Sequence, residues 1–324
     1  MKCLFCGEEI TERASEEERR TEWHRKCVRK FFLTDAMPEL DISSSEMEKL
    51  ANDTVMSGVT VPGVQKKISL HLSRQGTGRL TIVDYPAGYI LKPQTKDFPF
   101  LPEYEHTVMQ MAQAAGIRTV PFGLIRISDG YAYITRRIDR EIRESRIIRY
   151  AMEDFCQLSG RITRDKYKGS YEGCGRIIRR YSSQTGLDMT EFFMRIVFSF
   201  LTGNSDMHLK NFSLIERTPG SRVFGLSAAY DLLPVNLIMP EDKEETALTL
   251  NGKKHNIRRK DLLSLAENCG IPDRAAVKMT DNICRQKKTF LEICEGSHIP
   301  EPGKTALGQL IKERIRRISS QTMQ

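Results

Sequence analysis

The chain has 324 residues, of which 40% are hydrophobic and 28% are charged. This length is about twice that of a usual single domain, so we expect two packed lobes or one domain with appendages, and the composition excludes a disordered chain. The 50 Lys and Arg residues against 42 Asp and Glu residues give a net charge of +8, which suits a polyanionic partner or a phosphate-bearing ligand without identifying either.

The sequence contains no run of the roughly 20 uncharged apolar residues that a membrane helix needs. Its most apolar run, residues 192–201, is short and contains Arg195. The chain opens with MKCLFC and then becomes acidic, which does not resemble a secretory signal. We therefore expect a cytoplasmic protein that does not bind a membrane.

Four residues of metal-binding type gather within residues 1–34. Cys3 and Cys6 form one pair and His24 and Cys27 a second, each spaced so that a tight turn directs both side chains at one cation. Thiolate and imidazole ligands favour Zn²⁺ over Mg²⁺ or Ca²⁺. We predict a structural zinc knuckle whose folding depends on the ion; chance clustering in a flexible tail is the alternative.

Short extended segments dominate residues 55–137, after a polar linker at 35–54. Apolar Ile68, Leu70 and Leu72 alternate with polar residues, which predicts a strand whose hairpin partner lies at 80–83. This lobe is expected to be a twisted, mostly antiparallel sheet with one inserted helix. Its other predicted elements are strands at 89–93, 120–127 and 131–135 and a helix at 102–115.

The remaining residues, 138–324, are predicted to be mainly helical, with two short strand-like runs at 211–215 and 222–226. A small β-rich lobe followed by a larger helical lobe predicts an α+β, two-lobed, protein-kinase-like fold, although a fold alone does not establish chemistry. The predicted helices cover residues 152–158, 171–181, 190–201, 259–269, 274–294 and 305–319.

The densest group of polar residues is GNSDMHLKN at 203–211, directly after an apolar helix. Asp206 and Asn211 have the same separation as the Asp and Asn of the protein-kinase catalytic loop, in which the Asp accepts a hydroxyl proton and the Asn holds a metal ion. His208 also suits a hydrolase base, but without a G-x-S-x-G motif we assign it an orienting role. Lys210 completes the catalytic candidates.

A further carboxylate, Asp231, follows at the end of a predicted strand. Mg²⁺ prefers oxygen ligands, and Mg²⁺ neutralises the charge of a triphosphate, so Asp231 is a candidate metal ligand together with Asn211. Taken singly, Asp206 and Asp231 would more often be turn carboxylates. Their order and spacing favour a phosphoryl-transfer site.

Candidates for nucleotide binding lie upstream. Lys92 ends an apolar strand, and Glu105 shares a helical face with Met109 and Ala112. A carboxylate on an apolar face needs a partner, and Lys92 is the natural one. The loop at 57–67 has two glycines that let backbone N–H groups approach a phosphate. Its candidate residues are Gly63, Val64, Gln65 and Lys66.

Seven motifs in this order resemble those of the HipA family of bacterial Ser/Thr kinase toxins, over residues 55–315. The resemblance implies phosphoryl transfer from Mg²⁺-ATP to a serine or threonine, with Asp206 as base, Asn211 and Asp231 as Mg²⁺ ligands and Lys92 on the phosphates. It also implies a hinge at 133–137 that meets adenine, with Ile134 and Arg136 as candidates. The motifs are VPGVQKK at 61–67, YILKP at 89–93, LPEYEH at 101–106, ITRRIDR at 134–140, EDFCQ at 153–157, GNSDMHLKNFSL at 203–214 and AYDL at 229–232.

The resemblance further implies partners. Members of this family are restrained by a helix-turn-helix antitoxin, and characterised members phosphorylate aminoacyl-tRNA synthetases and autophosphorylate their Gly-rich loop. We therefore expect the toxin of a type II toxin–antitoxin system, with a HipB-like partner, DNA contact only through that partner and a protein substrate in translation. Thr60 and Ser57 are the candidate autophosphorylation sites.

The chain has the Cys/His segment and linker where full-length members have an additional N-terminal subdomain. It is therefore similar to short, HipT-like members, whose missing piece is a separate, small HipS-like protein. Two other functions stay open. The complete set of Asp206, Asn211, Asp231 and Lys92 disfavours a non-catalytic corepressor for a DNA-binding partner. The loop at 63–67 disfavours a small-molecule kinase of aminoglycoside type.

Overall fold

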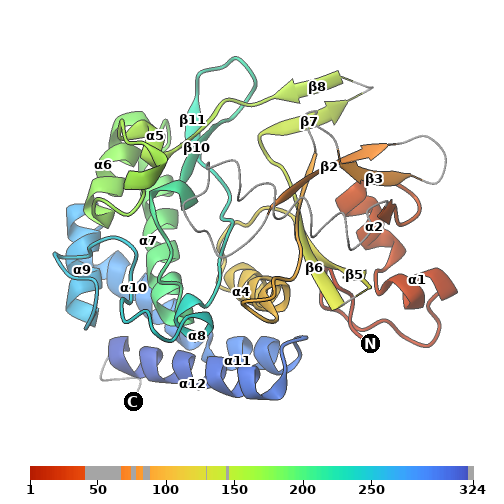
Figure 1. Ribbon diagram of the computed structural model, residues 1–324. Helices are drawn as coiled ribbons and strands as arrows, with labels where there is room; N and C mark the ends of the chain where they lie inside the picture. Colours follow the sequence, from red (N-terminus) through yellow and green to blue (C-terminus); the bar gives the residue numbers. More distant parts are fainter. Residues whose placement is uncertain (41–66, 74–77, 83–87, 129, 144–145, 320–324) are drawn as a thin grey trace. The chain divides into compact units, whose positions relative to one another are not determined.

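The computed structural model describes the chain apart from residues 41–66, 74–77, 83–87, 129, 144–145 and 320–324. The described residues form two compact units (Figure 1). Unit 1 contains Met1–His106 and Val120–Ile147, and unit 2 contains Thr107–Thr119 and the residues from Ile148 onwards. This mixed α+β architecture, with a curled sheet and a helical C-terminal part, is the predicted fold class.

A six-stranded sheet forms the centre of unit 1, in the order β1-β3-β2-β4-β6-β5. β1 pairs parallel with β3, and the other neighbouring strands pair antiparallel. The predicted hairpin is confirmed: β2 pairs with β3, and Ile68, Leu70 and Leu72 are buried. The strands are β1 (Glu39–Leu40), β2 (Ile68–Ser73), β3 (Arg79–Ile82), β4 (Tyr89–Lys92), β5 (Phe122–Ile127) and β6 (Gly130–Arg136).

Several predicted elements have different ends in the structure. The helix predicted at 190–201 covers Thr185–Thr202, and the strand predicted at 222–226 covers Phe224–Leu226. Part of the predicted linker is a strand, β1, since Glu39 and Leu40 pair with β3. Residues 41–54 of that linker lie outside the described residues. The predicted helix at 102–115 is α4 (Leu101–Ala114), which ends before Gly116 at a φ of 79°. A separate two-stranded sheet, not predicted, pairs β7 (Arg140–Arg143) with β8 (Arg146–Arg149).

The N-terminal segment packs on the sheet of unit 1 through an aromatic cluster. Two short helices, α1 (Glu16–Thr21) and α2 (Arg25–Phe32), flank Trp23, whose side chain is fully buried. The indole Nε1 donates to the carbonyl oxygen of Leu124 in β5 at 2.9 Å, and the Leu124 amide donates to the Leu4 carbonyl at 3.0 Å. The segment therefore adds backbone pairing as well as apolar burial to the edge of the sheet.

Unit 2 is built around α7, which packs against α6, α10 and α12 (Figure 1). A three-stranded antiparallel sheet, β11-β10-β9, completes it. The strands are β9 (Met152–Asp154), β10 (Ser213–Glu216) and β11 (Phe224–Leu226). The helices are α5 (Phe155–Leu158), α6 (Tyr171–Tyr181), α7 (Thr185–Thr202), α8 (Val235–Ile238), α9 (Arg259–Asn268), α10 (Asp273–Arg285), α11 (Lys287–Glu295) and α12 (Glu301–Ile318), with 3-10 turns η1 (Thr163–Asp165) and η2 (Leu209–Asn211).

Two predicted helices were wrong in part. The helix predicted at 152–158 is a strand up to Asp154, because Met152–Asp154 pairs with β10, and the extended Asp154 then caps α5 by accepting a hydrogen bond from the Gln157 amide at 2.9 Å. The helix predicted at 274–294 divides at Gln286, whose amide donates to the Ile283 carbonyl at 3.1 Å and so leaves the regular helical ladder.

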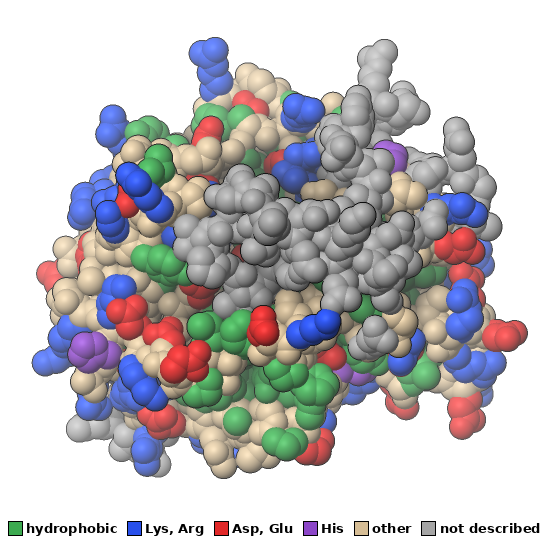
Figure 2. All heavy atoms as spheres, in the orientation of Figure 1, with side chains coloured by type: hydrophobic (Ala, Val, Ile, Leu, Met, Phe, Trp, Pro, Cys, Tyr) green, Lys and Arg blue, Asp and Glu red, His purple; other side chains and the backbone are tan. Residues whose placement is uncertain are grey.

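Charged side chains of both signs are intermixed on the face shown in Figure 2. Acidic groups therefore lie among the basic ones on that face, which weakens its attraction for a polyanion. Among the helices that the structure describes, none is long and apolar enough to span a bilayer.

Replacement of Gly123 in β5 by Ala tests the docking of the N-terminal segment. A Cβ atom on Gly123 would lie 2.7 Å from Cζ2 of Trp23 and 3.2 Å from the Leu4 carbonyl oxygen. Because the buried indole has little room to move, we expect the free energy of unfolding of unit 1 to fall by about 1–3 kcal/mol.

Denaturant unfolding followed by the fluorescence of Trp23, the single tryptophan of the chain, measures this change. Gly186→Ala in α7 is the matched control, since a Cβ there meets nothing within 4 Å. An unfolding midpoint for Gly123→Ala equal to that of the unaltered protein would contradict the described docking.

Candidate active site and metal site

Unit 1 contains a buried ion pair. The Lys92 Nζ at the end of β4 donates to Glu105 Oε1 on α4 at 2.6 Å, and the two side chains are 5% and 0% exposed. The ammonium also lies 5.3 Å from the centre of the Tyr133 ring. The pairing matches the one predicted from the sequence, whereas contact of Lys92 with phosphates stays a prediction. Because burying both charges carries a desolvation penalty, fold stability is a weak explanation for this pair.

The predicted hinge lies at the end of β6. Ile134 is fully buried and pairs with Leu91 of β4. The Arg136 guanidinium donates to the backbone carbonyls of Lys30 and Phe31 at 3.4 and 3.3 Å, so its side chain is held by the N-terminal segment. Contact of this strand with adenine stays a prediction. The loop candidates Gly63, Val64, Gln65 and Lys66 and the hydroxyls of Ser57 and Thr60 lie outside the described residues.

A second charged group follows the hinge. Burial alone would raise the pKa of Asp139, but hydrogen bonds from Arg137 and Arg140 outweigh that effect and lower the pKa to about 2. Arg137 donates to both carboxylate oxygens, at 2.8 and 2.7 Å, and Arg140 donates at 2.8 Å. This bidentate geometry fixes the backbone turn directly after β6.

The catalytic-loop candidates of unit 2 form one hydrogen-bonded set. Gly203 ends α7 with a φ of 77°, and the chain then turns sharply. The Asp206 amide donates to Asn204 Oδ1 at 3.2 Å, and Asn211 Nδ2 donates to the Asp206 carbonyl at 2.9 Å. Asn211 is buried, whereas the Asp206 carboxylate is 40% exposed. The loop therefore holds the Asn211 side chain and the Asp206 backbone in place while leaving the Asp206 carboxylate accessible to a reactant.

Asp231 is tied to the same loop through its neighbour Tyr230. The Tyr230 hydroxyl donates to the Lys210 carbonyl at 3.1 Å and lies 2.6 Å from Ser213 Oγ. Asp231 itself has a φ of 61°, a left-handed conformation that is uncommon outside glycine. Such conformations persist only where the surroundings impose them and are frequent at functional sites. The segments that end in Asn211 and Asp231 are thus joined directly.

The other two catalytic candidates have structural partners. His208 is buried, with Nε2 4.0 Å from Asp206 Oδ2. Lys210 forms an ion pair with Asp154 at 2.9 Å and so connects the loop to the start of α5. Tyr167 was not identified from the sequence: its hydroxyl donates to Asp206 Oδ1 at 2.6 Å. A tyrosine in a polar loop gives no sequence signal for such a contact.

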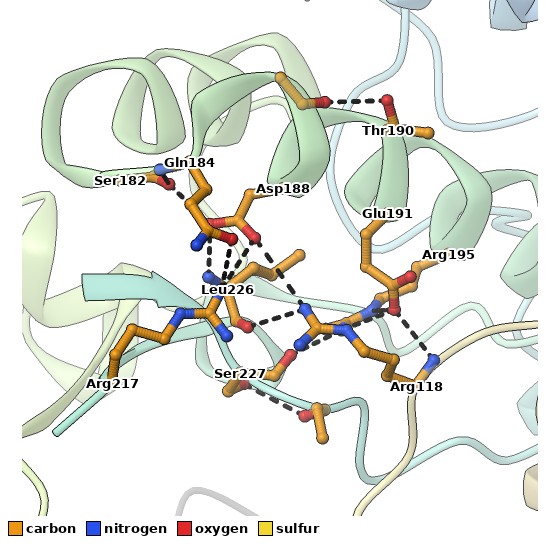
Figure 3. A network of polar contacts seen from close by, with 12 residues as sticks. Arg118, Ser182, Gln184, Asp188, Thr190, Glu191, Arg195, Arg217, Leu226 and Ser227 are labelled. Atoms are coloured by element: carbon orange, nitrogen blue, oxygen red, sulfur yellow. Dashed lines mark hydrogen bonds and ion pairs between the residues drawn. The ribbon is translucent and has the colours of Figure 1, made fainter. Parts of the chain in front are cut away.

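A buried polar network supports the strand that leads to Asp231 (Figure 3). Arg195 on α7 is fully buried and donates to Glu191 Oε1 at 2.9 Å and to the Ser227 carbonyl at 2.6 Å. Asp188, on the same helix, accepts from the Leu226 amide at 2.7 Å. Arg118 connects β11 to α7, because its guanidinium donates to the Leu226 carbonyl at 3.2 Å and its backbone amide donates to Glu191 at 3.1 Å. The end of β11 is therefore fixed by charged groups of α7.

Cys3, Cys6, His24 and Cys27 meet at one point of unit 1. Their ligand atoms all lie within 4.8 Å of one another, close to the roughly 3.8 Å between ligands expected for tetrahedral Zn²⁺ with bonds of about 2.3 Å. His24 Nδ1 lies 3.4 Å from Cys6 Sγ, while Nε2 lies 3.3 Å from the Glu9 carbonyl. A second hydrogen bond of this kind orients a histidine ligand. The four residues therefore fit a metal ion.

One thiol of the cluster ionises readily, while burial raises the pKa of Cys6. The side-chain hydrogen bond from Cys27 lowers the pKa of Cys3 to about 5, although burial opposes this. The same hydrogen bond raises the pKa of Cys27. The thiolate, and not the thiol, is the form that binds a metal.

The sequence profile of the HipA-like C-terminal domain matches residues 59–290. The chain belongs to the HipA-like family. Among curated proteins, it is 25% identical to a "Putative kinase" of Haemophilus influenzae over 88% of this chain and 89% of the relative. It is 30% identical to "Putative kinase Y4dM" of Sinorhizobium fredii over 76% of this chain and 62% of the relative.

Two solved structures are similar to this HipA-like chain. The HipA of Shewanella oneidensis, solved in a complex with HipB and its operator DNA, superposes with a TM-score of 0.65 at 18% identity, covering 79% of this chain and 63% of that one. The Helicobacter pylori proinflammatory kinase CtkA superposes with a TM-score of 0.52 at 14% identity, covering 77% and 93%. At these identities the likeness shows a kinase-like fold.

Removing the charge of Arg195 tests the network behind Asp231. In Arg195→Met the largely buried Glu191 carboxylate, 12% exposed, loses its guanidinium partner and keeps only the Arg118 amide, and the Ser227 carbonyl loses the guanidinium as well. We therefore expect the free energy of unfolding of unit 2 to fall by about 3–5 kcal/mol. Circular dichroism of the helices during denaturant unfolding measures the loss. Arg180→Met, an exposed position on α6, is the control and is expected to change stability little. Equal stability of the two variants would contradict the role of the network.

Proposed function

We propose that this HipA-like chain is an ATP- and Mg²⁺-dependent protein serine/threonine kinase and the toxin of a type II toxin–antitoxin system. The observation that carries the proposal is the direct joining of Asp206, Asn211 and the Asp231 segment by hydrogen bonds in unit 2. A buried Lys92–Glu105 pair in unit 1 supports it, since a lysine held by a carboxylate is the usual phosphate ligand of kinases. Family membership and the kinase-like fold add further support.

In this proposal each residue has one task. The oxygen of the acceptor hydroxyl bonds to the γ-phosphorus of ATP while the bond from that phosphorus to the ADP leaving group breaks. Asp206 receives the proton that the hydroxyl loses. Asn211 and Asp231 would hold Mg²⁺, which offsets phosphate charge when bound. Lys92 would contact the phosphates and Glu105 would keep its ammonium in place. His208 and Lys210 orient the loop through their contacts beside Asp206.

Replacement of the proposed base is the direct test. Full-length protein incubated with γ-labelled ATP and Mg²⁺ is expected to transfer label to itself or to an added protein acceptor, and Asp206→Asn is expected to slow transfer by about 10²–10⁴-fold. Asp273→Asn, at an exposed position of α10, is the matched control with normal transfer. Equal labelling by the unaltered protein and Asp206→Asn, or none by either, would refute the kinase proposal.

The proposed partners follow the family. We infer a HipB-like helix-turn-helix antitoxin, since the similar HipA of Shewanella oneidensis was solved with HipB and operator DNA, and DNA contact only through that antitoxin. A small HipS-like protein is a further proposed partner, and a translation component such as an aminoacyl-tRNA synthetase is the proposed substrate. Thr60 and Ser57 are the proposed sites of autophosphorylation.

We also propose that Cys3, Cys6, His24 and Cys27 bind one structural Zn²⁺ ion. The ligand set has no position left for a substrate, which is typical of structural rather than catalytic zinc. The segment of residues 1–34 is small, and metal binding supplies folding energy to segments of this size. The ion would thus stabilise the segment whose Trp23 packs against β5.

Metal analysis tests this site. The purified full-length chain is expected to contain about one zinc ion per molecule and Cys27→Ser much less, because it removes one of four ligands. Removal of zinc by a strong chelator should also change the fluorescence of Trp23. Cys294→Ser, a buried cysteine of unit 2, is the control with unchanged zinc content. Equal zinc content in Cys27→Ser and the unaltered protein would refute the site.

A further inference from the structure

Tyr167 contacts the proposed catalytic base directly. Its hydroxyl donates to Asp206 Oδ1 at 2.6 Å, which is within the range of charge-assisted O–H···O⁻ bonds. Burial, followed by the charge of Asp206, raises the pKa of Tyr167 above its usual range. The phenol therefore stays protonated at neutral pH and remains a hydrogen-bond donor.

The segment of Tyr167 is fixed to the catalytic loop from two further sides. The carbonyl of Lys166 accepts a hydrogen bond from the Leu209 amide at 3.2 Å. The Tyr167 ring packs edge-on against His208, with ring centres 5.1 Å apart. Nearby, Lys168 pairs with Asp165 of η1 at 2.7 Å. These contacts hold the hydroxyl at a defined position relative to Asp206.

An Asp206 carboxylate that is 40% exposed would otherwise have rotational freedom about its side-chain bonds. A general base must lie within hydrogen-bond reach of the proton that it takes, and misplacement by about 1 Å can cost about 100-fold in rate. A carboxylate has several acceptor positions, so a bond from Tyr167 to Oδ1 does not exclude a second hydroxyl donor. The phenol can thus orient the base without replacing the acceptor.

We propose that Tyr167 is a positioning residue of the phosphoryl-transfer site: its hydroxyl holds the Asp206 carboxylate in the orientation that receives the proton of an acceptor hydroxyl. This inference rests on the proposed kinase function. It adds to the site a residue from the loop after η1, far from the catalytic loop in the sequence.

The test compares Tyr167→Phe with the unaltered full-length protein in transfer of label from γ-labelled ATP to the chain itself. Loss of one hydrogen bond to a charged group is expected to lower the maximal rate about 10-fold or more. The ATP concentration at half-maximal rate is expected to change less than about 2-fold, since Tyr167 acts on the base in this proposal. Tyr181→Phe, at a residue exposed to 38% against 40% for Tyr167, is the matched control and should keep the normal rate.

An unchanged maximal rate in Tyr167→Phe, with active unaltered protein, would overturn this inference alone. A lower rate would also overturn it if the unfolding midpoint of Tyr167→Phe fell as well, or if the half-maximal ATP concentration rose by the same factor as the rate fell. In either case a general structural defect explains the loss. Absence of labelling by the unaltered protein would instead remove the kinase proposal and this inference with it.

Discussion

The buried Lys92–Glu105 ion pair is the constraint on which unit 1 depends. Two opposite charges at 2.6 Å, almost without solvent, persist only if both side chains are held on rigid elements. β4 supplies the lysine from the interior of the sheet, between β2 and β6, and α4 supplies the glutamate from a face shared with Met109 and Ala112. An interior strand of the sheet and the apolar face of α4 are thus joined by one pair of opposite charges, and removal of either charge would leave the other buried without it.

In unit 2, buried charged groups also connect two elements, α7 and the end of β11, and more residues take part than in unit 1. Asp231, in a left-handed conformation, lies five positions beyond the end of β11 and not at the strand end that the sequence predicted, and a three-residue strand has little stability of its own. The charged groups of α7 compensate, since Asp188 binds the Leu226 amide and Arg195 binds the Ser227 carbonyl. A long helix therefore sets the position of the short segment that precedes Asp231.

The sequence predicted those features that depend on local periodicity. Alternation located β2, and helical spacing placed Glu105 on the apolar face that meets Lys92. Features set by distant partners were missed: Met152–Asp154 is a strand only because β10 pairs with it. Arg195 was noted only as a charge that interrupts an apolar run, because its partner Ser227 lies in a different element. The Tyr167 contact depends on tertiary packing in the same way. The catalytic roles and the metal identity remain predictions.

The N-terminal segment packs against β4, the strand that ends at Lys92. The Tyr89 hydroxyl, at the first position of β4, donates to the carbonyls of Phe31 and Phe32 at 3.4 and 3.3 Å. The rings of these two phenylalanines lie 5.7 and 5.6 Å from that of Tyr89. The N-terminal segment therefore holds one end of β4, while the ion pair with Glu105 holds the other. A strand of only four residues is thus held at both ends, by the N-terminal segment at Tyr89 and by α4 at Lys92, so the position of the lysine is set by two elements that lie far apart in the sequence.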